Sequence, residues 1–205
     1  PEGGTLPYPT WLGYWPAAAG LFAFVWLELV SPDGVYVGPV RLWFAIYLGT
    51  MLVGSAIFGQ KWFERADPFE VYSTLVGRLS VWGRSRGGRL LVRSPLRNLA
   101  SVEAAPGLVA VVAVLLGSTA YDSFRGINFW LRFTQTYSGS LTLLGTGILV
   151  GLCLIVGLTF SGATILTGAS DHAIPRRRLP AAFAPSIVPI IVGYMVAHYS
   201  SFLVE

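Results

Sequence analysis

Long apolar runs alternate along the chain with short polar stretches, and this pattern predicts helices that cross a membrane. A spanning helix needs about 20 mostly apolar residues. We expect five such helices, at residues 14–30, 40–59, 106–120, 141–160 and 182–203. The sequence therefore predicts an all-α, multi-pass transmembrane bundle of about five spanning helices, with residues 1–205 forming a single integral membrane domain.

One further helix is predicted at residues 69–82, with a different pattern. Its apolar positions recur every three or four residues, while charged residues lie off that stripe. Asp67 and Pro68 come just before it and Glu70 near its start, which is typical of a capped helix N-terminus. We expect an amphipathic helix that lies in the membrane interface. After it, the Gly87-Gly88 pair and the short run 89–92 indicate one arm of a small hairpin.

Small residues recur four positions apart on three of the predicted spanning helices. The pairs are Ala19 and Ala23, Ala45 and Gly49, and Gly147 and Gly151. Such spacings let the backbones of membrane helices approach closely. They predict packing faces. Near the start of the last helix, Pro185 and Pro189 remove backbone hydrogen bonds and should bend it.

Composition supports a membrane protein, because 54% of residues are hydrophobic and only 12% are charged. Soluble domains carry about 25% charged residues. The formal net charge of +4 does not indicate nucleic-acid binding, since the basic residues lie in loops between helices. The one cysteine, Cys153, rules out an internal disulfide. The first residues contain no basic segment of the kind that begins a signal peptide, so we expect none.

The basic residues also predict the orientation of the chain in the cell membrane. Loops 60–105 and 161–180 hold eleven of the fourteen, and the opposite loops hold three. Short loops rich in Lys and Arg stay in the cytoplasm. We therefore expect a cytoplasmic N-terminus and an external C-terminus at Glu205. The basic residues of the two loops are Lys61, Arg65, Arg78, Arg84, Arg86, Arg89, Arg93, Arg97, Arg176, Arg177 and Arg178.

Three ionisable residues lie near the outward ends of the first, third and fifth spanning helices: Glu28, Asp122 and His198. Ionisable groups within membrane helices are costly and mark functional sites. Two carboxylates and a histidine could bind a divalent metal, or act as acid and base on a substrate. A structural interpretation stays open, in which the carboxylates pair with Arg41 or Arg125 or cap loops, and the imidazole donates a hydrogen bond to a carbonyl.

Other chemistry finds less support in the residues. A b-type haem would need an axial ligand opposite His198, and the only other histidine, His172, lies in a loop on the other side. Helix capping and a solvated face account for the carboxylates of Glu64, Asp67 and Glu70. The sequence has no zinc-protease, serine-hydrolase or phosphate-loop motif. A transporter is disfavoured because no paired broken helices are evident.

Several phrases resemble a known family. They include Leu6-Pro-Tyr-Pro with the run from Trp15 to Glu28, Arg65-Ala-Asp-Pro-Phe-Glu-Val-Tyr72, Gly117-Ser-Thr-Ala-Tyr-Asp122, and Val188 to Tyr199. Together they resemble the C-terminal half of an actinobacterial polytopic integral membrane protein family, often labelled fenitrothion hydrolase component. The family's earlier helices are absent from this sequence. The resemblance implies a membrane-embedded hydrolase of organophosphate esters, and it brings no mapped catalytic motif.

We therefore hold two hypotheses about function. The first is a non-catalytic or accessory subunit of a larger membrane complex, with the lipid bilayer and other membrane proteins as partners. The alternative is a membrane-embedded hydrolase of organophosphate or similar esters. Its outward-facing site would use Glu28, Asp122 and His198, with or without a metal. The substrate and any cofactor are not specified by the residues.

Overall fold

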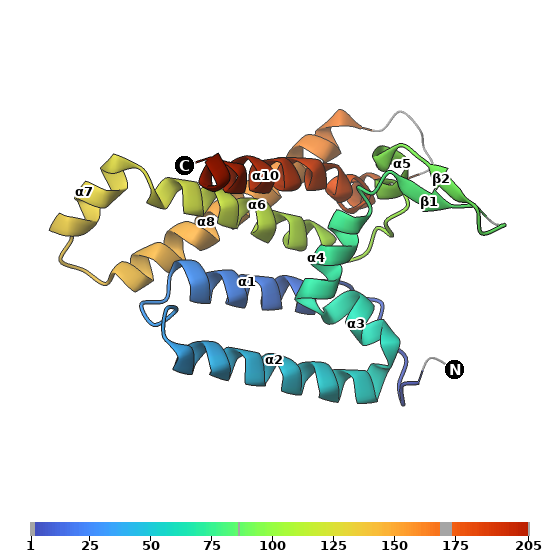
Figure 1. The fold of residues 1–205 in the computed structure, drawn as a ribbon, viewed down its shortest axis with the longest axis horizontal. Helices are drawn as coiled ribbons and strands as arrows, with labels where there is room; N and C mark the ends of the chain where they lie inside the picture. The colour runs from blue at the N-terminus through green and yellow to red at the C-terminus, as the bar shows by residue number, and fades with distance from the viewer. Residues whose placement is uncertain (1–2, 86, 169–173, 205) are drawn as a thin grey trace.

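The fold is an all-α bundle, as predicted, and the computed structural model describes residues 3–85, 87–168 and 174–204 (Figure 1). Its long helices are α1 (Trp15–Leu29), α2 (Val37–Phe58), α6 (Leu108–Arg125), α8 (Leu141–Thr167) and α10 (Val188–Val204). Its short helices are α3 (Gln60–Ala66), α4 (Pro68–Gly77), α5 (Pro95–Leu99), α7 (Asn128–Thr136) and α9 (Leu179–Phe183), with 3-10 turns η1 (Arg176–Arg178) and η2 (Ala184–Ile187). Strands β1 (Trp82–Arg84) and β2 (Leu90–Val92) complete the described chain.

Four segments of the described chain are long and apolar enough to cross a membrane. They are α2, α6, α8 and the stretch Arg176–Ser200 that ends in α10, while α1 is apolar but shorter. The chain is therefore an integral membrane protein with about five apolar helices. At 1.5 Å per residue, the 27-residue α8 is about 40 Å long, more than the ~30 Å hydrocarbon core needs.

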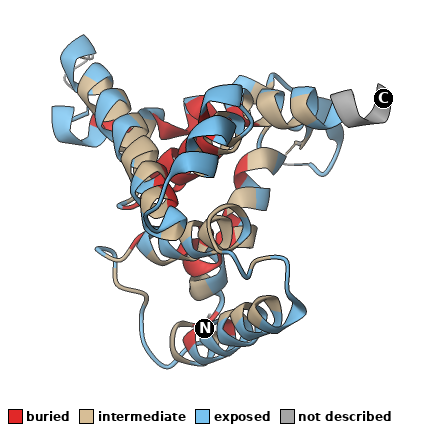
Figure 2. Cartoon of the chain, turned by 90° about the vertical axis from the view of Figure 1, so that its left-hand side faces the viewer, coloured by how far each residue is buried: buried red, intermediate tan, exposed pale blue. Residues whose placement is uncertain are grey.

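Helix α6 lies at the centre of the bundle and packs against α1, α8, α9 and α10. Leu108, Val111 and Val112 on α6 are fully buried, and the buried residues gather where these helices meet (Figure 2). The two helices α2 and α8 lie mostly at the outside, because only 11% of each apolar window is buried within the chain. Their outer faces are available to lipid or to partner helices.

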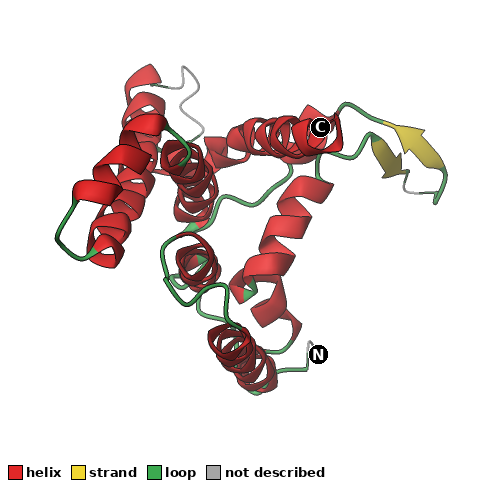
Figure 3. Cartoon of the chain, turned by 60° about the vertical axis from the view of Figure 1, so that its left-hand side comes forward, coloured by secondary structure: helices red, strands yellow, loops and turns green. Residues whose placement is uncertain are grey.

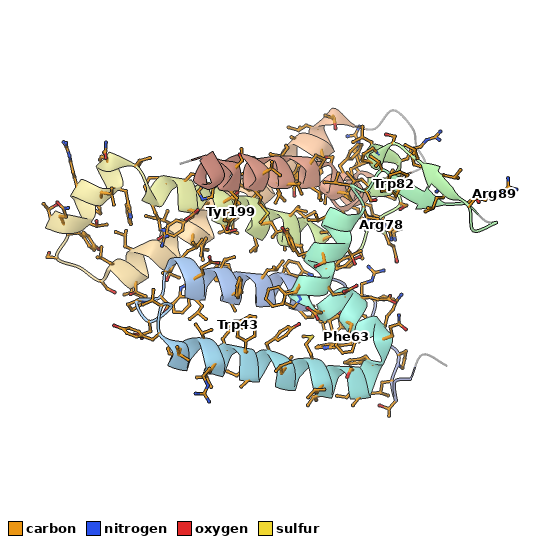
Figure 4. All side chains as sticks on the ribbon, in the orientation of Figure 1. Trp43, Phe63, Arg78, Trp82, Arg89 and Tyr199 are labelled. Atoms are coloured by element: carbon orange, nitrogen blue, oxygen red, sulfur yellow. The ribbon has the colours of Figure 1, made fainter. Side chains whose placement is uncertain are left out.

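Helix α2 is attached to the bundle mainly through aromatic rings. The Trp43 ring lies between α1 and α2, with its centroid 5.2 Å from that of Phe24 and 5.8 Å from that of Phe69 (Figure 4). Tyr47 stacks on Trp43 at 5.4 Å and donates a hydrogen bond to Asp67. Such aromatic pairs add roughly 0.5–1.5 kcal/mol each beyond the area that they bury.

The amphipathic helix begins as predicted but ends earlier. Asp67 caps α4, since its carboxylate accepts from the backbone N–H groups of Phe69 and Glu70. The helix ends at Gly77, five residues before the predicted end, and Trp82 belongs to β1 instead. Trp82 pairs with Val92 in the antiparallel hairpin, and this pairing requires an extended backbone that no helix can supply. The hairpin projects from the bundle (Figure 3).

Two more helix ends differ from the prediction. Helix α6 continues to Arg125 instead of ending at residue 120, because Arg125 forms an ion pair with Asp122 one turn earlier and bonds a carbonyl of α1. Helix α8 extends to Thr167 instead of residue 160. The predicted helix 182–203 is interrupted at its start by the 3-10 turn η2, which contains Pro185, and α10 follows from Val188.

Helices α6 and α8 pack through a different face of α8 from the one predicted. Gly145 lies against Tyr121, Cys153 against Gly117, and Gly157 against Ala113. The predicted pair Gly147 and Gly151 lies on the other side of α8, and a Cβ added at either would meet nothing within 4 Å. Positions two residues apart on a helix point in directions about 200° apart. Gly145 and Gly157 therefore face one side of α8, and Gly147 and Gly151 face nearly the opposite side.

Candidate functional site

The predicted site residues lie at one end of the bundle. Helices α1, α6 and α10 run in the same direction and end near the α1–α2 turn and α7, opposite the β-hairpin (Figure 1). This arrangement follows from alternating passes of the chain. It places the C-terminal turns that carry Glu28, Asp122 and His198 on the same side of the molecule.

Asp122 and His198 face each other between α6 and α10. The distance from Asp122 Oδ2 to His198 Nε2 is 4.0 Å, and about a third of each side chain is exposed. This separation is longer than a hydrogen bond, so the contact is an ion pair only when the imidazole is protonated. The structure thus brings together two of the three predicted residues, one acidic and one able to carry a proton.

Arg125 connects this pair to α1. Its Nη2 lies 3.5 Å from Asp122 Oδ1, and its Nη1 donates a hydrogen bond of 2.6 Å to the carbonyl oxygen of Leu29. That carbonyl belongs to the last turn of α1, where cations are favoured by the helix dipole and by unpaired carbonyls. The sequence had offered Arg125 as a partner for Asp122, and this ion pair is confirmed.

Tyr194 holds His198 from one side. The two rings are nearly parallel, with an interplanar angle of 10° and centroids 5.5 Å apart, as expected for residues one helical turn apart. The Tyr194 hydroxyl also forms a hydrogen bond of 2.9 Å with Ser123 Oγ on α6. The ring of Tyr199, which is labelled in Figure 4, lies edge-on to the imidazole, with the two ring centroids 5.4 Å apart. The imidazole therefore has a defined orientation toward α6.

Glu28 does not join this cluster. Its side chain is exposed and has no hydrogen bond or ion pair with the residues that the structure describes. Over those same residues, no three His, Cys, Asp or Glu side chains form a group that could hold a metal ion. The geometry supplies a carboxylate–imidazole pair flanked by two hydroxyl groups, and the three-residue site remains a prediction.

Sequence reasoning did not find the bond between Ser123 and Tyr194. The spacing of Tyr194 and His198 on one helix face was visible in the sequence, but a contact between α6 and α10 depends on how the helices are rotated. Ser123 next to Asp122 is the only signal the sequence carries, and serines on membrane helices are common.

Comparisons with known proteins provide no further evidence about function. No protein-family model matches the chain, and no curated protein or solved structure matches it either. The resemblance drawn from the sequence phrases therefore stays an expectation, and proposals about function rest on the geometry.

Proposed function

We propose that this protein is a non-catalytic subunit of a larger membrane complex, in which α2 and α8 pack against helices of partner proteins. One observation carries this proposal. The glycines on the small-residue faces of both helices, which were predicted to be packing surfaces, face open space within the described part of the chain.

The glycines on these faces are open. A Cβ placed on Gly49 of α2, or on Gly147 or Gly151 of α8, would meet no atom within 4 Å. By contrast, the glycines that pack inside the chain are crowded, and a Cβ at Gly117 would lie 2.8 Å from Cys153. Lipid chains can cover any apolar face, whatever its residue sizes. Small residues four positions apart are instead typical of interfaces between membrane helices, because they let two backbones approach closely.

The same proposal includes an orientation. The basic segments from α3 and η1 lie at one end of the bundle, where Lys61, Arg65, Arg177 and Arg178 line a common cavity. We place this end in the cytoplasm and the end that carries Asp122 and His198 outside, following the excess of basic residues in cytoplasmic loops.

Purification from native membranes in a mild detergent tests the subunit proposal. Native mass spectrometry should detect the unchanged protein as part of a complex with other proteins. The double variant Gly147→Leu/Gly151→Leu places two large side chains on the small-residue face of α8. It should be detected as the monomer, while its helix content stays the same. The matched control is Leu166→Phe, which enlarges an 86% exposed side chain on the same helix and should keep the complex. A stable monomer of the unchanged protein, or a complex that survives the double variant, would contradict the proposal.

A second candidate function is the membrane-embedded ester hydrolase, favoured by the contact between Asp122 and His198. In that reaction His198 would take a proton from water as the water oxygen bonds to phosphorus, and the alkoxide or aryloxide would leave. Asp122 would stabilise the imidazolium. His198→Ala and Asp122→Asn should each lower hydrolysis of a nitrophenyl phosphotriester by purified protein, and Glu28→Gln should leave it unchanged. Full hydrolysis by the His198→Ala variant would rule this function out.

A further inference from the structure

A cavity of about 600 Å³ lies at the basic end of the bundle, and neither Asp122 nor His198 lines it. It lies between the N-terminal segment, α3, the residues before α6, and the turn η1. Its size is within the 300–1,000 Å³ range typical of ligand pockets. Its charged lining consists of four cations and one carboxylate, Lys61, Arg65, Arg177, Arg178 and Glu103, which leaves three net positive charges.

Arg65 is one of the residues that line this cavity. Its side chain is nine-tenths buried, its guanidinium lies 4.6 Å from the centre of the Tyr14 ring, and its Nη2 forms an ion pair with Glu103. Its Nη1, however, is buried and has no hydrogen-bond partner among the described residues. A buried donor of a charged group that lacks an acceptor is costly, so Arg65 is an incompletely paired cation beside the cavity.

Arg177 and Arg178 also line the cavity. Both are exposed residues of η1, and neither forms an ion pair with a carboxylate within the described part of the chain. Glu103, the one acidic group of the lining, is 73% exposed and is already paired with Arg65. Arg177 and Arg178 are therefore positively charged residues that line the cavity and have no carboxylate partner among the described residues.

From these observations we infer that the cavity binds a phosphate ester. Arginine guanidinium groups bind phosphate through paired N–H donors, and three arginines converge here from α3 and η1. Tyr8 and Trp11 supply aromatic surface beside the cations, and the Trp11 side chain is 72% exposed. Exposed tryptophan is enriched at the membrane interface, which is also where lipid phosphates lie. The phosphate could thus come from an anionic lipid headgroup or from a soluble phosphate ester, and the chemistry of recognition is the same.

The full-length protein in nanodiscs provides the test. One arm uses phosphatidylcholine nanodiscs with and without phosphatidylglycerol and measures retained lipid by native mass spectrometry. The other arm titrates glycerol 3-phosphate into phosphatidylcholine nanodiscs and follows Trp fluorescence. The test variant is Arg177→Gln/Arg178→Gln. The control is Arg176→Gln/Arg89→Gln, which removes the same charge from exposed residues outside the cavity lining.

The unchanged protein should bind one of the two probes saturably. The Arg177→Gln/Arg178→Gln variant should bind it about a hundredfold more weakly, from about tenfold for each arginine that loses a charge-assisted hydrogen bond to phosphate. The control should retain the original affinity. Retained phosphatidylglycerol would identify a lipid site, and saturable glycerol 3-phosphate binding would identify a soluble ligand. Glu103→Gln, which removes the one carboxylate of the lining, should tighten binding.

Two results would overturn the inference. One is the absence of saturable binding of either probe by the unchanged protein. The other is an equal loss of affinity in the test and control double variants, since that would show attraction to surface charge in general. The circular dichroism spectra of all variants should match, because the substituted side chains are exposed.

Discussion

The closest approach between α6 and α8 predicts that Gly117→Ala destabilises the protein. A Cβ at residue 117 would lie 2.8 Å from both Cα and Sγ of Cys153 and 2.9 Å from its backbone nitrogen. Ordinary van der Waals contact begins at about 3.5 Å. Because two of the three crowding atoms belong to the backbone of α8, no rotamer change can relieve the clash, and the two helices must move apart.

The size of the effect follows from two opposing contributions. Overpacking of a well-packed interior costs about 1–3 kcal/mol. Replacing glycine by alanine within a helix stabilises it by roughly 0.5–1 kcal/mol. The net loss of unfolding free energy should therefore be about 1–2 kcal/mol. Gly147→Ala on α8 is the matched control, because its Cβ would meet nothing within 4 Å and only the favourable contribution applies.

Unfolding in detergent micelles, followed by circular dichroism as denaturing detergent is added, measures both variants against the unchanged protein. Gly117→Ala should unfold at a lower fraction of denaturing detergent and Gly147→Ala at an equal or higher one. If Gly117→Ala is as stable as Gly147→Ala, the close α6–α8 packing is wrong, and so is the helix rotation that sets Asp122 against His198.

Three further predictions concern single contacts. Thr146→Val removes the 2.8 Å hydrogen bond from Trp26 Nε1 between α1 and α8, and the unfolding free energy should fall by about 0.6 kcal/mol, the average for such bonds in membranes. Asp67→Ala should cost about 1–2 kcal/mol through loss of the α4 cap, and Asp67→Asn less, in the same unfolding assay. Burial raises the pKa of Tyr8 to about 12 from 10.0, against the opposing effect of Arg65. Because the folded state favours the neutral phenol, its contribution to stability is complete below pH 10 and is lost as pH rises through about 12. Tyr8→Phe should remove one group titrating near 12 in the tyrosinate absorbance and weaken the alkaline loss of stability.

Much of the fold could be read from the sequence because a bilayer leaves few choices. Backbone polar groups in lipid must be satisfied within the segment, so long apolar runs predict helices. The predicted helix at 40–59 corresponds to α2 (Val37–Phe58), and the predicted 14–30 to α1 (Trp15–Leu29). The cap at Asp67 and one arm of the small hairpin were also predicted correctly, since both depend on local residue types.

The short helices were missed for a related reason. Helix α7 (Asn128–Thr136) and α5 (Pro95–Leu99) are too short to produce a clear periodic pattern, and α7 is held by aromatic contacts. Trp130 of α7 packs against Phe124 near the end of α6, with ring centroids 5.1 Å apart. This contact joins residues of two separate helices, and no local sequence pattern predicts it.

The sequence alone determined where the long apolar helices lie, where the basic loops lie, and that Asp122 and His198 belong to helices of the same direction. Each of these features depends on composition and on the spacing of residues along the sequence. Only the tertiary structure decided how each helix is rotated about its axis. This rotation brings Asp122 opposite His198 and leaves Glu28 exposed. It also places Gly145 and Gly157 of α8, and not Gly147 and Gly151, against α6. Neighbouring faces of an apolar membrane helix differ little in hydrophobicity, so shape complementarity between helices selects the face.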